Sequence, residues 1–169
     1  MKIRLFVDMD GTLAEWRKAS RFEELLEKGY FRSLQPHQNV VDAIRTIIRD
    51  HSDIIDVYSL SAYLTESEYA LNEKHAWLDE FCPELAPDKR IFVPCNERKT
   101  AYIPDGIRST DILLDDYSFN LHDWAKYAHG VKLLNGINAT VGTWCGDCIS
   151  RFVPADEIVA DIMRFAKAL

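Results

Sequence analysis

The feature that most constrains this chain lies near its amino end, where an apolar run stops at two carboxylates. The run covers residues 3–7, which is too short for a helix and has the length of a buried strand. Asp8 and Asp10 follow it, and Gly11 then lets the backbone turn sharply away. Because an unpaired buried charge is costly, this order predicts a strand that ends at an open edge of a sheet, beside something cationic.

The rest of the chain alternates between strand-like and helix-like patterns. Short apolar runs predict further strands at residues 54–60, 90–94, 111–114 and 131–134. Apolar stripes and capping residues predict helices at about residues 21–28, 39–49, 66–81 and 120–130, and a last helix after Pro154. The helix at 66–81 is expected to begin at a capping box formed by Thr65 and Glu68. This alternation is typical of an α/β protein with a parallel sheet and helices on both faces.

Polar side chains stand at the carboxyl ends of these predicted strands. Such positions are held by Asp8, Asp10, Ser61 and Asp115. In an open parallel sheet these ends meet at one edge, beside the point where the strand order reverses, so we expect the side chains to gather there. Asp115 is followed by Asp116, and adjacent acids after an apolar strand favour a site for Mg²⁺, which takes oxygen ligands.

Length and charge limit the classes of protein and of partner. A chain of 169 residues is long enough for one domain with a sizeable core, so we expect a single domain over residues 1–169. The net charge of -7 gives no support to a nucleic acid polymer or a membrane surface as partner. Because we find no secretory signal and no membrane-spanning run, and expect the four cysteines to be reduced, the sequence predicts a cytoplasmic protein. It leaves open whether the chain forms a homodimer.

The stretch Asp8-Met9-Asp10-Gly11-Thr12 resembles motif I of the phosphatases in the haloacid dehalogenase (HAD) superfamily, which carry Asp-x-Asp-Gly-Thr/Val after the first strand. The resemblance implies a Rossmann-like sheet with a small helical cap, here inserted at about residues 14–38. It also implies an Mg²⁺-dependent phosphomonoesterase that forms an aspartyl-phosphate intermediate. Asp8 is then the nucleophile and a metal ligand, and Asp10 is the general acid and base, with its main-chain carbonyl on the metal. The metal-binding acids of motif IV are matched by Asp115 and Asp116.

Two further motifs of the superfamily have candidates in this chain. Motif II is a strand that ends in Ser or Thr, whose hydroxyl binds a phosphate oxygen, and Ser61 fits it better than Ser59 because it stands nearer the strand end. Motif III is a Lys or Arg that neutralises the phosphate, and Lys99 is favoured over Arg98. An ordinary strand-end serine and a solvated surface lysine would give the same sequence, so both assignments are predictions.

Longer stretches resemble the cytosolic-type 5′(3′)-deoxyribonucleotidase family within this superfamily. They are residues 8–14, 29–36, 58–62 and 113–121. The resemblance implies hydrolysis of (deoxy)nucleoside monophosphates. Because aromatic faces stack on bases, we expect a wall for the base or sugar near the cap, although packing of the cap explains the same residues equally well. The candidates for this wall are Trp16, Tyr30, Phe31 and Arg32.

Other functions fit parts of the same pattern. A phosphatase of this superfamily could act on another small phosphate monoester, because the motifs define phosphate chemistry and say little about the leaving group. A dehalogenase also uses the first Asp, but carbon–halogen displacement needs no acid at Asp10. A binding protein that kept the fold and lost turnover is the non-enzymatic alternative.

The run Trp144-Cys145-Gly146-Asp147-Cys148 looks like the active site of a thioredoxin. Such a Cys-x-x-Cys belongs near the start of a chain, between an early strand and a long helix. Here it stands close to the carboxyl end, so we expect a loop with two reduced thiols and no part in catalysis.

Overall fold

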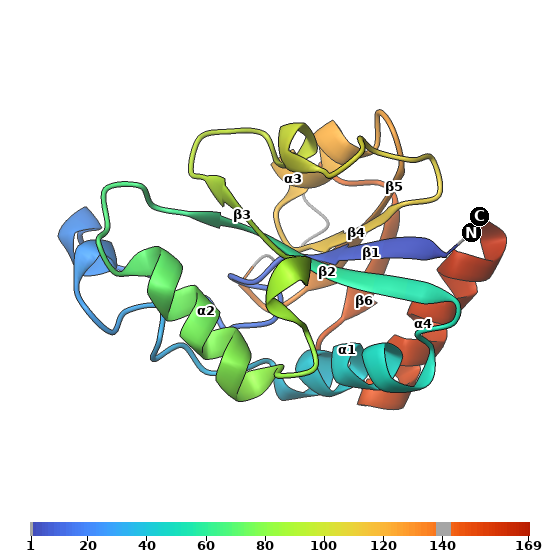
Figure 1. Cartoon of the computed structure of the whole chain (residues 1–169), viewed down its shortest axis with the longest axis horizontal. Coiled ribbons are helices and arrows are strands. Elements are labelled where there is room, and N and C mark those ends of the chain that lie inside the picture. The colour runs from blue at the N-terminus through green and yellow to red at the C-terminus, as the bar shows by residue number, and fades with distance from the viewer. Residues whose placement is uncertain (1, 138–142) are drawn as a thin grey trace.

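The computed structural model describes residues 2–137 and 143–169, and its centre is a six-stranded parallel sheet (Figure 1). The strands lie side by side in the order β3-β2-β1-β4-β5-β6. Their bounds are β1 (Ile3–Val7), β2 (Ile55–Tyr63), β3 (Arg90–Pro94), β4 (Ile112–Asp115), β5 (His129–Leu134) and β6 (Asp147–Ser150). The predicted α/β class with a parallel sheet is therefore confirmed.

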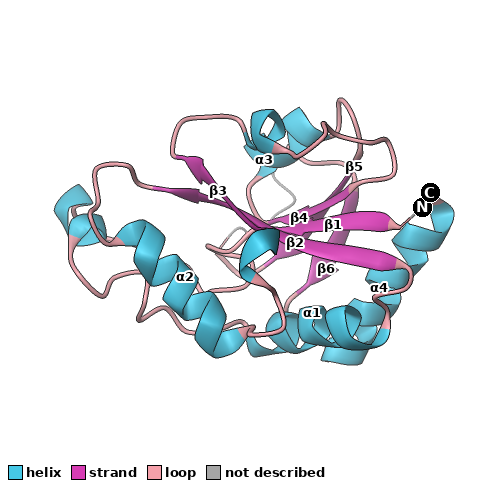
Figure 2. Cartoon of the chain, viewed as in Figure 1, coloured by secondary structure: helices cyan, strands magenta, loops and turns pink. Residues whose placement is uncertain are grey.

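Helices cover both faces of the sheet, as predicted (Figure 2). Those in the described ranges are α1 (Gln38–Asp50), α2 (Ala70–Phe81), α3 (Ser118–Trp124) and α4 (Ala155–Ala168), with 3-10 turns at η1 (Phe22–Leu26), η2 (Pro87–Lys89) and η3 (Lys99–Tyr102). Figures 1 and 2 show α1, α2 and α4 on one face and α3 on the other. Within residues 2–137 and 143–169, none of the helices has both the length and the apolar character needed to cross a membrane.

The alternation of side chains along β1 explains the two layers. Leu5 and Val7 belong to the larger apolar core, which α1, α2 and α4 complete. Phe6 points to the opposite face, where its ring packs edge-on against Trp124 of α3 at a centroid distance of 5.3 Å. Strand β1 is therefore buried on both sides, in keeping with an apolar run that only Arg4 interrupts.

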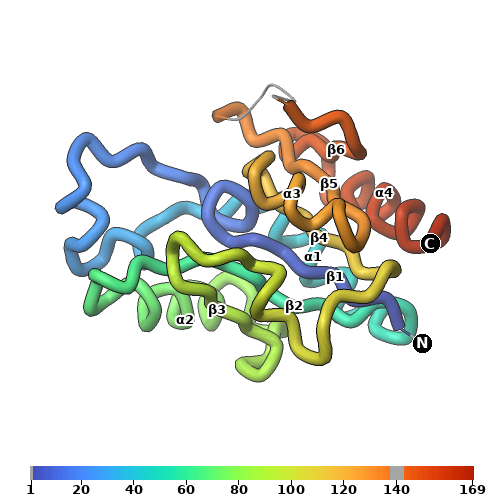
Figure 3. Tube along the Cα trace, turned by 90° about the horizontal axis from the view of Figure 1, so that it is seen from above, coloured from blue at the N-terminus to red at the C-terminus, as the bar shows by residue number. Residues whose placement is uncertain are grey.

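The strand order reverses beside β1, and this places the carboxyl ends of β1 and β4 at the switch point. From β1 the chain adds β2 and β3 on one side, and β4, β5 and β6 on the other. Ligands of open α/β sheets bind at such a point. The segment 14–38 extends beyond the sheet on the side away from the two termini (Figure 3). It contains η1 and turns, so the helix expected at 21–28 is a single short 3-10 turn.

Helix α2 begins later than predicted, at Ala70, because a different residue satisfies its first N–H groups. Thr65 does not form the expected capping box, and its hydroxyl contacts the side chain of Glu66. The hydroxyl of Ser67 accepts the backbone N–H groups of Tyr69 and Ala70 at 3.3 and 3.1 Å. The start of the helix is therefore stabilised from Ser67.

The carboxyl-terminal third also departs from the prediction. Helix α3 begins at Ser118 and ends at Trp124, and Gly130 lies inside β5. Strand β6 was not predicted, because only Ile149 of its four residues is buried and no apolar run marks it. Cys148 lies in this strand, so the expectation that Cys145 and Cys148 share a loop is wrong for Cys148.

Candidate active site

Three carboxylates meet where β1 and β4 end. Asp8 follows β1, Asp115 is the last residue of β4, and Asp116 comes next. Side-chain oxygens of the three residues lie within 4.8 Å of one another, and all three residues are buried. The backbone N–H of Asp8 donates to the carbonyl of Leu114 at 2.9 Å, which holds the two strand ends together. Oxygen donors gathered in this way suit a hard divalent cation such as Mg²⁺.

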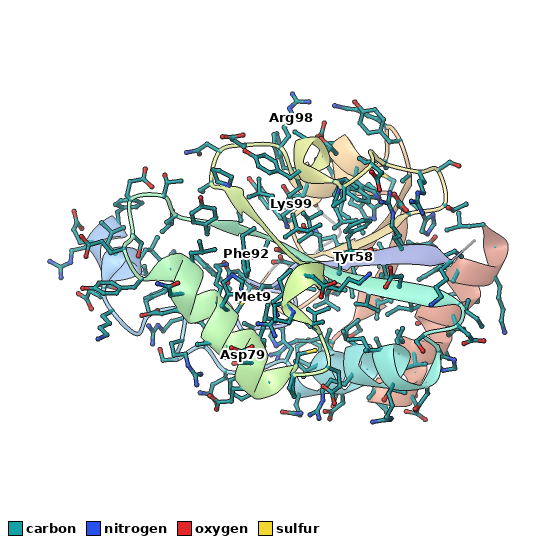
Figure 4. The ribbon with its side chains drawn as sticks, viewed as in Figure 1. Met9, Tyr58, Asp79, Phe92, Arg98 and Lys99 are labelled. Atoms are coloured by element: carbon teal, nitrogen blue, oxygen red, sulfur yellow. The ribbon has the colours of Figure 1, made fainter. Side chains whose placement is uncertain are left out.

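Lys99 contacts two members of this acid cluster. It is the first residue of η3, and its Nζ lies 2.7 Å from both Asp8 Oδ1 and Asp115 Oδ2. Burial alone would lower the pKa of Lys99, but the charges of Asp115 and Asp8 outweigh burial and raise it. Arg98, the other candidate, donates instead to Asp123 at 2.8 Å. In Figure 4 Arg98 lies at the outer edge of the molecule, whereas Lys99 lies closer to the strands.

Asp115 is the most deeply enclosed acid of the cluster. Burial raises the pKa of Asp115, and the charge of Asp8 raises it further, although Lys99 opposes both. One carboxylate oxygen accepts the N–H of Tyr117 at 2.8 Å, and the other accepts the side-chain amide of Asn120 at 2.9 Å. A cation at this position would offset the repulsion between the acids, which is a physical reason to expect one.

Asp116 is placed by close contact with the turn that follows β1. Gly11 has a φ of +80°, and a Cβ added there would lie 2.4 Å from Asp116 Oδ2. Asn135, which follows β5, donates its side-chain amide to Asp116 Oδ2 and to the carbonyl of Gly11, both at 2.9 Å. Asn135 therefore ties Asp116 to the turn that carries Asp10. It escaped the sequence analysis, although it stands at a strand end like the acids.

A second lysine, Lys74 of α2, connects Asp10 with Ser61. Its Nζ lies 2.5 Å from Asp10 Oδ2 and 3.0 Å from the hydroxyl of Ser61, and the whole side chain is buried. Ser59 lies farther back in β2, level with Val7 of β1. The sequence contained a signal for Lys74: it shares the apolar stripe of α2 with Ala70, Trp77 and Leu78, where a charge is out of place.

Asp10 has the environment of a carboxyl group that can carry a proton. Burial raises the pKa of Asp10, while the charge of Lys74 lowers it and the charge of Asp8 raises it, and the net direction is upward. Lys74 occupies Oδ2, whereas the buried Oδ1 has no hydrogen-bond partner among the described residues. Oδ1 is thus a buried acceptor that no described residue satisfies.

A cleft of about 710 Å³ opens over these groups. Its walls are formed by Asp8, Asp10, Trp16, Ala62, Cys95, Asn96, Glu97, Arg98, Lys99, Asp116, Tyr117, Phe119 and Asn120. The volume lies within the range of small-molecule sites, about 300–1,000 Å³. The cleft joins the segment after β1, the loop between β3 and η3, and the turn between β4 and α3.

The residues predicted to bind the substrate are dispersed. Trp16 lines the cleft. Phe31 lies in the apolar core with an exposure of 2%, and its ring faces Lys74, whose Nζ is 5.0 Å from the ring centroid. Arg32 forms an ion pair with Glu80 of α2. Packing against α2 therefore accounts for Phe31 and Arg32 in this structure.

Comparison with known proteins identifies a family for this chain and a solved structure with a similar fold. The family model described as "5′ nucleotidase, deoxy (Pyrimidine), cytosolic type C protein" matches residues 13–141, about three quarters of the chain. Asp8 and Asp10 precede the matched segment, so they do not contribute to the match. Among solved structures, the HAD domain of the effector protein Lem4 from Legionella pneumophila, an inactive mutant, is similar with a TM-score of 0.50. That likeness has 13% identity and covers 99% of this chain and 95% of the other. No curated protein matches the chain.

Proposed function

The chain belongs to the cytosolic-type C family of 5′ deoxyribonucleotidases in the HAD superfamily, and from this premise we propose that it is an Mg²⁺-dependent phosphomonoesterase acting on (deoxy)nucleoside monophosphates. The observation that carries the proposal is the acid cluster at the switch point of the sheet, with Lys99 against two of its members. Paired acids on the surface are common, but Asp8 and Asp116 are buried and line one cleft together with Asp10 and Lys99. Such an arrangement needs a chemical reason.

Asp8 is the proposed nucleophile. Its carboxylate oxygen forms a bond to phosphorus while the ester bond to the leaving oxygen breaks, which gives an aspartyl-phosphate and an alcohol. Lys99 Nζ lies 2.7 Å from Asp8 Oδ1, a contact that orients the carboxylate. Water then attacks the phosphorus, the bond to Asp8 breaks, and inorganic phosphate leaves.

Asp10 is the proposed general acid and base. In the first step its proton goes to the leaving oxygen, and in the second step it accepts a proton from the attacking water. Its raised pKa suits this role, and its Oδ1 has no partner in the described ranges, whereas Oδ2 is held by Lys74. Lys74 therefore fixes the orientation of the carboxyl group, and Ser61 and Lys99 are proposed to bind oxygens of the phosphoryl group.

The donor set fits Mg²⁺. Asp8, Asp115 and Asp116 would supply side-chain oxygens, and Asp10 its main-chain carbonyl. When bound, the ion would neutralise the charge of the phosphate that the acids would otherwise repel. The residues around it, Asn135 and Asn120, keep Asp116 and Asp115 in place through their side-chain amides.

Residues 14–38 are proposed to act as a small cap within a single domain that spans the chain. The segment follows directly from the turn of Asp10 and carries Trp16 to the cleft. It leaves the cleft open enough for a nucleotide, and equally for other small esters. The cap therefore does not by itself select the leaving group.

Phosphate release from an aryl phosphate, with and without Mg²⁺, tests the chemistry. We expect activity that requires the ion and is lost in Asp8→Asn with the circular dichroism spectrum unchanged. Asp53→Asn, which changes an exposed aspartate in the turn after α1, is the matched control and should keep full activity. A folded Asp8→Asn protein with normal turnover would refute the mechanism.

A panel of phosphate monoesters tests the substrate. We expect deoxynucleoside monophosphates to be cleaved faster than sugar phosphates such as glucose 6-phosphate. If sugar phosphates are cleaved at least as fast as nucleotides, the chain is a HAD phosphatase for another ester. If nucleotides bind but no ester is cleaved, it is a binding protein that kept the fold.

A further inference from the structure

Two aromatic rings stand exposed at the mouth of the cleft. Tyr117 and Phe119 are 58% and 62% exposed, and both line the same cleft as Asp8 and Lys99. Their ring centroids are 6.1 Å apart, with an interplanar angle of 36°. Neither residue belongs to the apolar cores on the two faces of the sheet. Packing within the fold therefore gives no account of these two rings, in contrast to Phe31.

The turn after β4 and the first residues of α3 fix the two rings relative to the acid cluster. Tyr117 follows Asp116 directly, and its backbone N–H donates to Asp115 Oδ1 at 2.8 Å. Asn120, one residue after Phe119, donates to the other oxygen of Asp115 at 2.9 Å. The same carboxylate that is proposed to hold the metal thus anchors the start of α3, where the two rings lie. The two rings would therefore lie at a fixed distance from a phosphate bound at Asp8.

We propose that Tyr117 and Phe119 determine specificity by contacting the base of the nucleotide, an inference that rests on the proposed function. A base stacks on an aromatic face through its own π-system, and every base has one. The contact therefore selects esters that carry a flat ring and discriminates weakly among the bases. Trp16 can add a third ring from the segment after β1, but it is partly packed against the core.

The test compares KM for deoxythymidine monophosphate with KM for glycerol 2-phosphate, which has no ring. In Phe119→Ala the KM for deoxythymidine monophosphate, divided by the KM for glycerol 2-phosphate, should rise at least about fivefold. That is the smallest effect expected from the loss of one base–aromatic stack. Phe119→Trp restores a large ring and should bring the ratio back towards that of the wild type. Tyr117→Leu keeps apolar bulk without a ring and should raise the ratio in the same direction.

Phe152→Ala is the matched control. Phe152 is 64% exposed, follows β6, and does not belong to the lining of the cleft, so its removal should leave the ratio unchanged. The inference is overturned if the wild type cleaves both esters and neither Phe119→Ala nor Tyr117→Leu changes the ratio. In that case the phosphatase assignment stands. If the wild type cleaves neither ester, the proposed function fails and this inference falls with it.

Discussion

Replacing Gly11 by alanine tests whether the turn after β1 sets the position of Asp116. Gly11 has a φ of +80°, in the left-handed region that disfavours side chains. A Cβ there would lie 2.4 Å from Asp116 Oδ2, 2.6 Å from its Cγ and 2.8 Å from its Oδ1. All three distances are too short for non-bonded atoms, so the carboxylate must move. Its hydrogen bond from Asn135 at 2.9 Å would then be strained or lost.

The expected cost has two parts. A left-handed backbone costs about 1–2 kcal/mol for a residue with a side chain. Forcing an extra methyl group into a packed site adds about 1–3 kcal/mol. Gly11→Ala should therefore lower the free energy of unfolding by about 2–5 kcal/mol. Because Asp116 is a proposed ligand, displacing it should also weaken Mg²⁺ binding, by about 10- to 100-fold as for other changes that misplace metal ligands.

Gly106→Ala separates the two parts. Gly106 has a φ of +76°, but a Cβ there would have nothing within 4 Å. In this control the free energy of unfolding should fall only by the cost of the left-handed backbone, about 1–2 kcal/mol, and Mg²⁺ binding should be unchanged. Urea unfolding would measure the free energies, and titration calorimetry would measure the affinity for the ion. Equal losses of stability in the two variants, with equal Mg²⁺ binding, would show that Asp116 is not constrained by Gly11.

Three more predictions concern other buried charges. Lys74→Met should lower stability by about 3 kcal/mol in urea unfolding, because Asp10 loses its partner, and Asp10→Asn in the same chain should recover part of that loss. Burial lowers the pKa of His37 from 6.5 to about 4, so stability present above pH 6.5 is lost as the pH falls towards 4. In His37→Gln, the loss of unfolding free energy between pH 7 and pH 4.5 should be about 2–3 kcal/mol smaller than in the wild type. Arg4→Met breaks a buried ion pair with Asp111 at the amino end of β1, so it should cost about 3–5 kcal/mol in urea unfolding and leave KM for an aryl phosphate unchanged.

The middle of the sheet could be predicted because two features of the sequence mark each of the strands β1 and β4. Strand β1 combines an apolar run with acids at its end, and β4 repeats that pattern with Asp115 and Asp116. A nearly continuous apolar run is typical of a strand buried on both faces, so it predicts the strand and its place in the middle of the sheet. Placing the acids at one edge then follows from the parallel order alone.

Strand β6 and the details of the cleft could not be predicted for the opposite reason. The edge strand has one buried residue, Ile149, and its pairing with β5 comes from the backbone, which carries no signal in the side chains. Phe31 illustrates a different limit. An aromatic residue near a predicted site can line it or support it, and only the packing of the segment 14–38 against α2 shows that Phe31 is in the core.

Two carboxylates that are only two residues apart along the chain reach different environments, and this difference matters most for the chemistry. Asp8 lies 2.7 Å from the ammonium of Lys99, within the acid cluster. Asp10 has a raised pKa, with one oxygen held by Lys74 and the other without a partner among the described residues. Two acids held by different partners in this way can divide the roles of attack and proton transfer. The two lysines come from α2 and η3, after different strands, so the division of roles depends on the fold and not on the Asp-x-Asp spacing alone.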